Sequence, residues 1–173
     1  GASILNMGSV REQIHKEFEI LGVPLYRAFY PDFSGANKNT YRWGNVEGIA
    51  FAPNSNFLLC GMRNPLVAGR APVFAIEGVD LAFDTGDINQ MKLADLFCLD
   101  LGGRGISDLC WDPVTKGYLI TAARSNGPKI DKDQPYPPNQ LDSALFWWSG
   151  RKTEIPLLFA KAPDMTVEAI CRL

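Results

Sequence analysis

Two arginines and two glutamates occupy positions from which their side chains could bind a ligand. Arg63 and Arg124 each stand at the end of a short apolar run, which predicts the same place for them in two successive units. An arginine presents five donors in a planar fork that fits carboxylate or phosphate, so two neighbouring forks could converge on one anion. In the alternative interpretation, each arginine pairs with an acidic neighbour and stabilises its own unit.

Glu47 and Glu168 are predicted to occupy the same position in the first and third of three successive units. Ser107 occupies that position in the second unit, and Asp108 follows it. Carboxylates that gather at one point could hold a hard cation such as Ca²⁺, which accepts several oxygen ligands in flexible geometry. They could equally accept hydrogen bonds from main-chain amides or arginines, and no Asp-x-Asp-x-Asp-Gly loop supports a calcium site. The sequence therefore assigns no metal or other cofactor, and Glu47 and Glu168 remain the candidates for Ca²⁺.

Arg104 lies in a glycine-rich run, Leu-Gly-Gly-Arg-Gly at residues 101–105. The run enters a predicted strand, whereas a phosphate cradle of the usual kind precedes a helix. It is therefore expected to be a tight crossover between units, from which Arg104 could still reach a ligand or pair with Asp100.

Nucleophilic catalysis has little support in the sequence. The only histidine is His15 and no Gly-x-Ser-x-Gly motif occurs, so a Ser-His-Asp triad is not expected. A hydrolase would have to use a metal or carboxylate–arginine chemistry. The four cysteines contain no Cys-x-x-Cys pair, which argues against zinc, and their apolar surroundings predict buried thiols or a disulfide. They are Cys60, Cys98, Cys110 and Cys171.

The elements that must position these residues recur along the chain. Residues 46–53 match residues 106–113 at an offset of 60, and residues 167–171 continue the series at an offset of 61. Two further matches follow at an offset of 61, residues 58–63 with 119–124 and residues 96–99 with 157–160. Three matches in one order make coincidence an inadequate explanation.

Each unit has the pattern of four short strands separated by turn residues. The predicted strands are 47–51, 57–62, 71–77 and 93–101 in the first unit, and 107–111, 117–122, 143–148 and 154–159 in the second. Four antiparallel strands per repeat of this length are typical of a β-propeller blade. The expected fold is all-β, with a short N-terminal helix where Val10, Ile14 and Phe18 recur at helical spacing.

The repeats predict one domain over residues 1–173, with units at about 46–105 and 106–166 and a third unit that starts at 167. Propellers close with at least ~4 blades, so the expected body is a partial propeller. A longer chain, missing residues or a second chain would then complete the ring, and residues 23–33 could supply outer strands of a preceding blade. The proline-rich insertion at 125–141 is expected to be a binding loop or a tether.

Three stretches carry a resemblance to a known family: Asn45–Phe51, residues 58–71 and residues 99–109. Together they resemble the bacterial DUF3616 family of uncharacterised proteins, over about residues 45–173. The Glu-Gly-Ile strand and the following Gly-x-Arg strand are more distantly similar to esterase-like phytase propellers. The resemblance implies a propeller-like fold, no assigned reaction, and family members longer than this chain.

Composition excludes several functional classes. The chain has 173 residues, 17 basic against 19 acidic residues and a net charge of -2, so it lacks the basic footprint of a nucleic-acid-binding protein. Its apolar runs are shorter than the ~20 residues that cross a bilayer, and no signal peptide is visible. A soluble globular chain is expected, with no compartment assigned.

The sequence therefore predicts a propeller-like module that binds an unidentified small anion or a protein, with no assigned reaction. One alternative is a metal- or arginine-assisted hydrolase acting on a phosphate ester or a similar anion. Another is an interaction scaffold that contacts its partner through residues 127–138. Whether the protein is an enzyme stays open. The candidate ligand-binding residues are Glu47, Arg63, Arg104, Asp108, Arg124 and Glu168.

Overall fold

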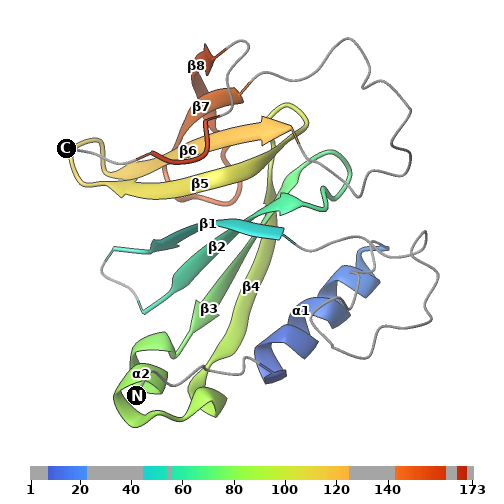
Figure 1. Cartoon of the computed structure of the whole chain (residues 1–173), viewed down its shortest axis with the longest axis vertical. Helices are drawn as coiled ribbons and strands as arrows, with labels where there is room; N and C mark the ends of the chain where they lie inside the picture. Colours follow the sequence, from blue (N-terminus) through green and yellow to red (C-terminus); the bar gives the residue numbers. More distant parts are fainter. Residues whose placement is uncertain (1–7, 23–44, 54–55, 125–142, 163–166, 171–173) are drawn as a thin grey trace.

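Two four-stranded antiparallel sheets form the body of the protein, and each follows the order of its strands in the chain (Figure 1). The first sheet contains β1 (Asn45–Phe51), β2 (Leu58–Asn64), β3 (Ala71–Glu77) and β4 (Lys92–Leu99). The second contains β5 (Arg104–Asp112), β6 (Gly117–Arg124), β7 (Ser143–Trp148) and β8 (Leu157–Ala162). The computed structural model describes residues 8–22, 45–53, 56–124, 143–162 and 167–170.

The all-β prediction is confirmed for these residues, and each predicted strand has a counterpart. The described residues form two separate sheets and no closed ring. The predictions for residues 23–33, residues 125–141 and Cys171 lie outside the described part of the chain.

The last strand begins later than the sequence predicts, at Leu157 instead of residue 154. Glu154 is part of a turn in which its amide donates to the Arg151 carbonyl at 3.1 Å, and its carboxylate accepts from the Ser149 hydroxyl. Pro156 follows and has no amide hydrogen for a strand ladder. Local side-chain bonding therefore holds this stretch in a turn.

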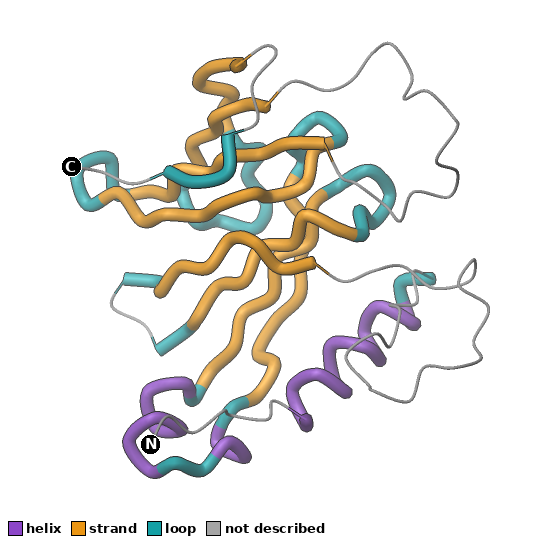
Figure 2. Tube along the Cα trace, in the orientation of Figure 1, coloured by secondary structure: helices purple, strands orange, loops and turns teal. Residues whose placement is uncertain are grey.

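Helix α1 (Gly8–Ile20) confirms the predicted N-terminal helix and packs beside the first sheet (Figure 2). Its apolar positions Val10, Ile14 and Phe18 are all buried. Two short helices between β3 and β4, α2 (Val79–Thr85) and a 3-10 turn (Ile88–Gln90), were not predicted. With seven and three residues, both are shorter than the window of about 11 residues over which helical periodicity is read.

The two faces of the first sheet serve two different cores, as the alternation of side chains along a strand requires. Leu59, Val73 and Ala75 face the second sheet and join a core that includes Phe146 and Trp148. On the opposite face, the residues between these positions along β2 and β3 belong to a second core, which the sheet shares with α1. These are Cys60, Met62, Phe74 and Ile76.

Phe18→Ala should lower the free energy of unfolding by about 3 kcal/mol, because the side chain is fully buried in the core shared with α1. The measurement is urea unfolding followed by far-UV circular dichroism. Ile20→Ala, near the same helix end and 69% exposed, serves as the control and should change stability by less than about 0.5 kcal/mol. Equal effects of the two substitutions would show that α1 does not pack on the sheet in solution.

The two sheets approach each other closely at two glycines, whose lack of a side chain leaves room for a residue of the opposite sheet. A Cβ atom at Gly61 would lie 2.8 Å from the Ile106 side chain, and one at Gly48 would lie 2.6 Å from it. Both glycines therefore make room for Ile106 of β5, which is fully buried between the sheets. β5 accordingly lies across β1 and β2 (Figure 1).

The strand ladders fix the register of the repeat. Ile49 pairs with Cys60 in the first sheet and Leu109 pairs with Ile120 in the second, so both partners recur after 60 positions. The offset of 61 expected for the second strand of each unit is therefore wrong by one residue. In the observed register, Gly61 corresponds to Thr121.

Candidate functional site

Three of the predicted binding residues meet in one charged cluster. Arg63, near the end of β2, places its Nη1 atom 2.7 Å from Oε2 of Glu47 on β1. The same nitrogen lies 3.0 Å from Oε2 of Glu168, which belongs to the short segment 167–170. Glu47 also accepts a hydrogen bond from the Asn45 side chain at 2.6 Å. We call Glu47, Arg63 and Glu168 the charged triad.

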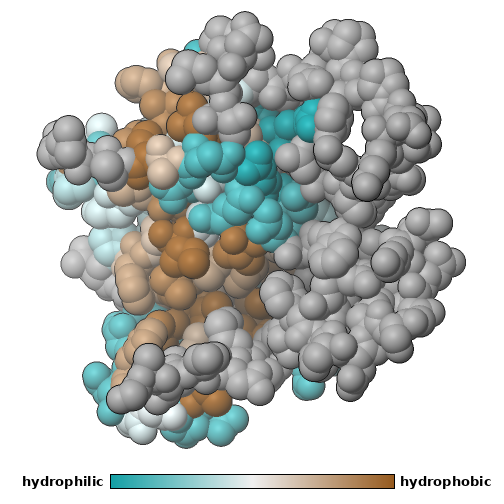
Figure 3. Space-filling view, in the orientation of Figure 1, coloured by the Kyte–Doolittle hydropathy of each residue, from teal (hydrophilic) through white to brown (hydrophobic). Residues whose placement is uncertain are grey.

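The charged triad lies at the junction of the two sheets. Nε of Arg63 donates to the main-chain oxygen of Arg124 at 3.3 Å, which ties the end of β2 to the end of β6. The Arg63 side chain is 11% exposed, against 24% for Glu47 and 59% for Glu168. Figure 3 shows a hydrophilic band across the middle of the molecule, between hydrophobic regions above and below it.

The expected equivalence of Arg63 and Arg124 is wrong. With the offset of 60, Arg63 corresponds to Ala123 and not to Arg124. Arg63 is the extra residue at an irregularity of the β1–β2 ladder, since Asn45 pairs with Asn64 and the next residue, Val46, pairs with Met62. An extra residue of this kind re-aims its side chain, and sequence matching gives no sign of it.

Arg104 closes the glycine-rich crossover. Its side chain folds back, and Nη1 donates to the carbonyls of Leu101 and Gly102 at 3.3 and 3.4 Å. Asp100 accepts from the Gly102 amide at 3.0 Å. The crossover prediction thus matches the geometry, and these contacts give Arg104 a structural role.

Asp108 fastens the segment 167–170 to the second sheet. Its carboxylate accepts from the Leu109 amide and from the Ile170 amide, both at 2.8 Å. Ser143 accepts from the Val167 amide at 3.1 Å at the other end of the segment. Sequence reasoning missed Ser143, whose only signal is its place at the start of a predicted strand.

The carboxylates of the charged triad do not form a cation cage. Arg63 lies between Glu47 and Glu168, where a cation would have to sit to use both of them. Within the described ranges, no group of three or more His, Cys, Asp or Glu side chains is placed to hold a metal ion. The residues present therefore do not fit Ca²⁺.

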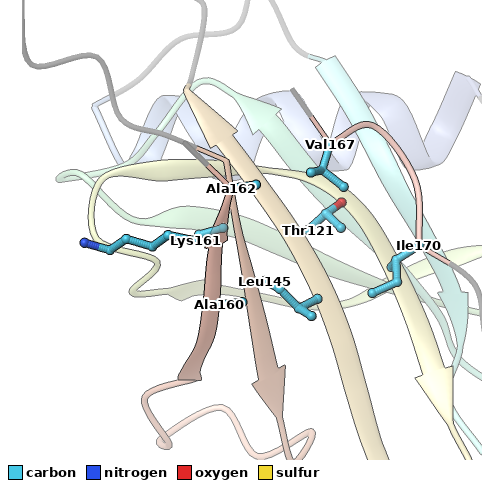
Figure 4. Close-up of a pocket in the computed structure, with 8 residues that line it drawn as sticks. Thr121, Leu145, Ala160, Lys161, Ala162, Val167 and Ile170 are labelled. Carbon is cyan, nitrogen blue, oxygen red and sulfur yellow. The ribbon is translucent and has the colours of Figure 1, made fainter. Parts of the chain in front are cut away.

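A cavity of about 160 Å³ lies between the second sheet and the segment 167–170 (Figure 4). Thr121, Leu145 and Ala160 line it from the sheet, and Val167 and Ile170 line it from the segment. The Oγ atoms of Thr121 and of nearby Ser107 are buried and have no hydrogen-bond partner among the described residues. Sequence reasoning missed Thr121, because it lies inside a predicted strand and has no sequence signal of its own.

Burial raises the pKa of the Cys60 thiol to about 12 and that of the Tyr118 hydroxyl to about 12. Cys60 is therefore a neutral core side chain at neutral pH and not a nucleophile. A hydrogen bond from the Asn89 amide lowers the pKa of the Asp87 carboxyl. A hydrogen bond from the Ser149 hydroxyl lowers the pKa of the Glu154 carboxyl. Neither Asp87 nor Glu154 is close in sequence to a residue of the charged triad.

No helix in the part of the chain that the structure describes is both long and apolar enough to cross a membrane. Comparison of the chain with models of known protein families, with curated proteins and with solved structures found no match.

Proposed function

We propose that this chain is a β-propeller-like binding module, made of two adjacent blades and the first segment of a third, residues 167–170. It binds a ligand or a partner, and no reaction is assigned to it. The observation that carries the proposal is the meeting of Glu47 and Glu168 on one nitrogen of Arg63. These glutamates hold equivalent positions in the first and third units, and equivalent positions of inner strands converge around the axis of a propeller.

The way the units dock on one another supports the same proposal. Ile106 packs over Gly61 of the first sheet. Val167, which corresponds to Ile106 at an offset of 61, lines the cavity over Thr121 of the second sheet. Since Thr121 corresponds to Gly61, the segment 167–170 lies on the second sheet as β5 lies on the first.

The pairing of charges argues against hydrolysis at the charged triad. A hydrolase that used carboxylate–arginine chemistry would need these groups free to meet an anionic substrate. In the charged triad, one guanidinium already bridges two carboxylates, and Arg104 is bonded to its own crossover. The triad therefore holds inner strands together.

A propeller needs ~4 or more blades, so the proposal requires further sheets from a second chain or from other segments of the same protein. The resemblance to the DUF3616 family implies a propeller-like fold and so agrees with this proposal. It remains a prediction.

A double-mutant cycle tests the convergence of the inner strands. Arg63→Gln should lower the free energy of unfolding by about 2 kcal/mol, because it removes charge-assisted hydrogen bonds at a largely buried site. Arg63→Gln, Glu168→Gln and the double variant, compared by urea unfolding, should give a coupling energy of about 0.5 kcal/mol or more. Arg151→Gln, in an exposed local pair with Glu154, is the control and should have almost no effect.

A coupling energy of zero between Arg63 and Glu168 would show that the first and third units do not converge. The purified chain should also release no phosphate from p-nitrophenyl phosphate or phytate. Turnover that Arg63→Gln abolishes in a folded variant would replace the proposal with the hydrolase alternative.

A further inference from the structure

The cavity over the second sheet has the properties of a ligand site, and part of the argument rests on the same repeat as the propeller proposal. Its walls are apolar side chains, Leu145 and Ala160 from the sheet and Val167 and Ile170 from the segment. Its volume is about 160 Å³. An enclosed apolar cavity of about this size holds one benzene molecule, and this one is partly open, because Ala160 in its wall is exposed.

One polar group faces this apolar space without a partner. Thr121 is 1% exposed, and its hydroxyl makes no hydrogen bond within the described residues. Figure 4 shows the hydroxyl oxygen of Thr121 on the side of Val167, whereas Lys161 extends its amine away from the other labelled side chains. A buried hydroxyl without a partner is unfavourable, and it can both donate and accept a hydrogen bond.

The first sheet shows what covers the corresponding surface there. Thr121 pairs with Leu145 as Gly61 pairs with Val73, so the two cavity residues correspond to Gly61 and Val73. Val73 belongs to the core between the sheets, together with the aromatic ring of Phe146. None of the residues that line the cavity over the second sheet is aromatic.

We propose that the cavity binds one neutral aromatic ring with a single hydrogen-bonding substituent, which bonds to the Thr121 hydroxyl. The ligand should carry no charge, because the amine of Lys161 points away from the cavity and the other residues that line it are uncharged. p-Cresol has this chemistry as a free compound, and the tyrosine side chain has it as part of a polypeptide.

Titration of the purified chain with p-cresol and with toluene tests the inference, by calorimetry and ligand-observed NMR. Both compounds should bind saturably at one site, and p-cresol should bind about fivefold tighter because of its hydrogen bond. Thr121→Val keeps the shape of the side chain and should make the two affinities equal. Ala160→Leu should fill the cavity and abolish binding of both compounds.

Leu157→Ala is the matched control, because Leu157 lies on the same strand as Ala160 and outside the cavity lining. It should leave both affinities unchanged, with folding of every variant checked by circular dichroism. N-acetyl-tyrosinamide separates the two sources of the ring. Binding as tight as that of p-cresol indicates a polypeptide tyrosine, and binding at least tenfold weaker indicates a free phenol.

Three results would overturn the inference. They are no saturable binding of p-cresol, unchanged binding in folded Ala160→Leu, and a preference for p-cresol that survives Thr121→Val. None of them bears on the coupling between Arg63 and Glu168, so the propeller proposal stands or fails separately.

Discussion

Gly105→Ala should lower the free energy of unfolding by about 3 kcal/mol or more. A Cβ atom at Gly105 would overlap the main-chain carbonyl of Arg63, which a change of rotamer cannot relieve. β5 would have to move away from β2, and the charged triad would move with Arg63. Urea unfolding should show a lower midpoint with an unchanged slope, the pattern of lost stability.

Gly86→Ala is the control for the intrinsic cost of replacing a glycine. Gly86 has a φ of +70°, and a Cβ atom added there would meet nothing within 4 Å, so only backbone strain opposes the change. That strain amounts to about 1 kcal/mol. If Gly105→Ala cost no more than Gly86→Ala, the two sheets would not approach as closely as described.

Trp148→Ala should lower the free energy of unfolding by about 4 kcal/mol. The side chain is 1% exposed at the centre of the core between the sheets. Its ring lies 5.1 Å from that of Tyr118 and 5.7 Å from that of Phe97, which belongs to the other sheet. The indole nitrogen also donates to the Arg151 carbonyl at 2.9 Å, so truncation would remove aromatic packing and a hydrogen bond together.

Trp148→Phe provides a measurable intermediate if the alanine variant does not fold, and it should lose less stability than Trp148→Ala. Phe159→Ala is the control for an aromatic residue on the same sheet, because Phe159 is 74% exposed. It should change stability by less than about 0.5 kcal/mol. Comparable losses for Trp148 and Phe159 would contradict the packing of the two sheets.

The strands could be predicted because their signals are local. Alternating side chains, the turn residues at 113–116 and the recurrence after about 60 residues identify eight strands in two sets of four. The turn illustrates the point, since Asp112 accepts from the amides of Val114 and Thr115, as turn chemistry leads one to expect. The helix α1 was equally accessible from the spacing of Val10, Ile14 and Phe18.

The partners of the candidate site could be predicted only in part. Glu47, Arg63 and Glu168 were identified as candidates, and a structural pairing of the arginine was one of two open interpretations. The contact between Arg63 and Glu168 spans 105 residues, and no local pattern specifies such a contact. The role of Ser143 depends in the same way on a neighbour outside its own strand, the segment 167–170.

The sequence by itself determined the repeated strand quartets, the face of α1 that is buried and the residue types available for binding. Only the tertiary structure decided the register of the repeat. In that register Arg63 is not equivalent to Arg124, and Thr121 is equivalent to Gly61. The physical reason is that one extra residue in a ladder shifts every later side chain to a different neighbour, while composition and periodicity barely change. The charged triad and the cavity both depend on that register.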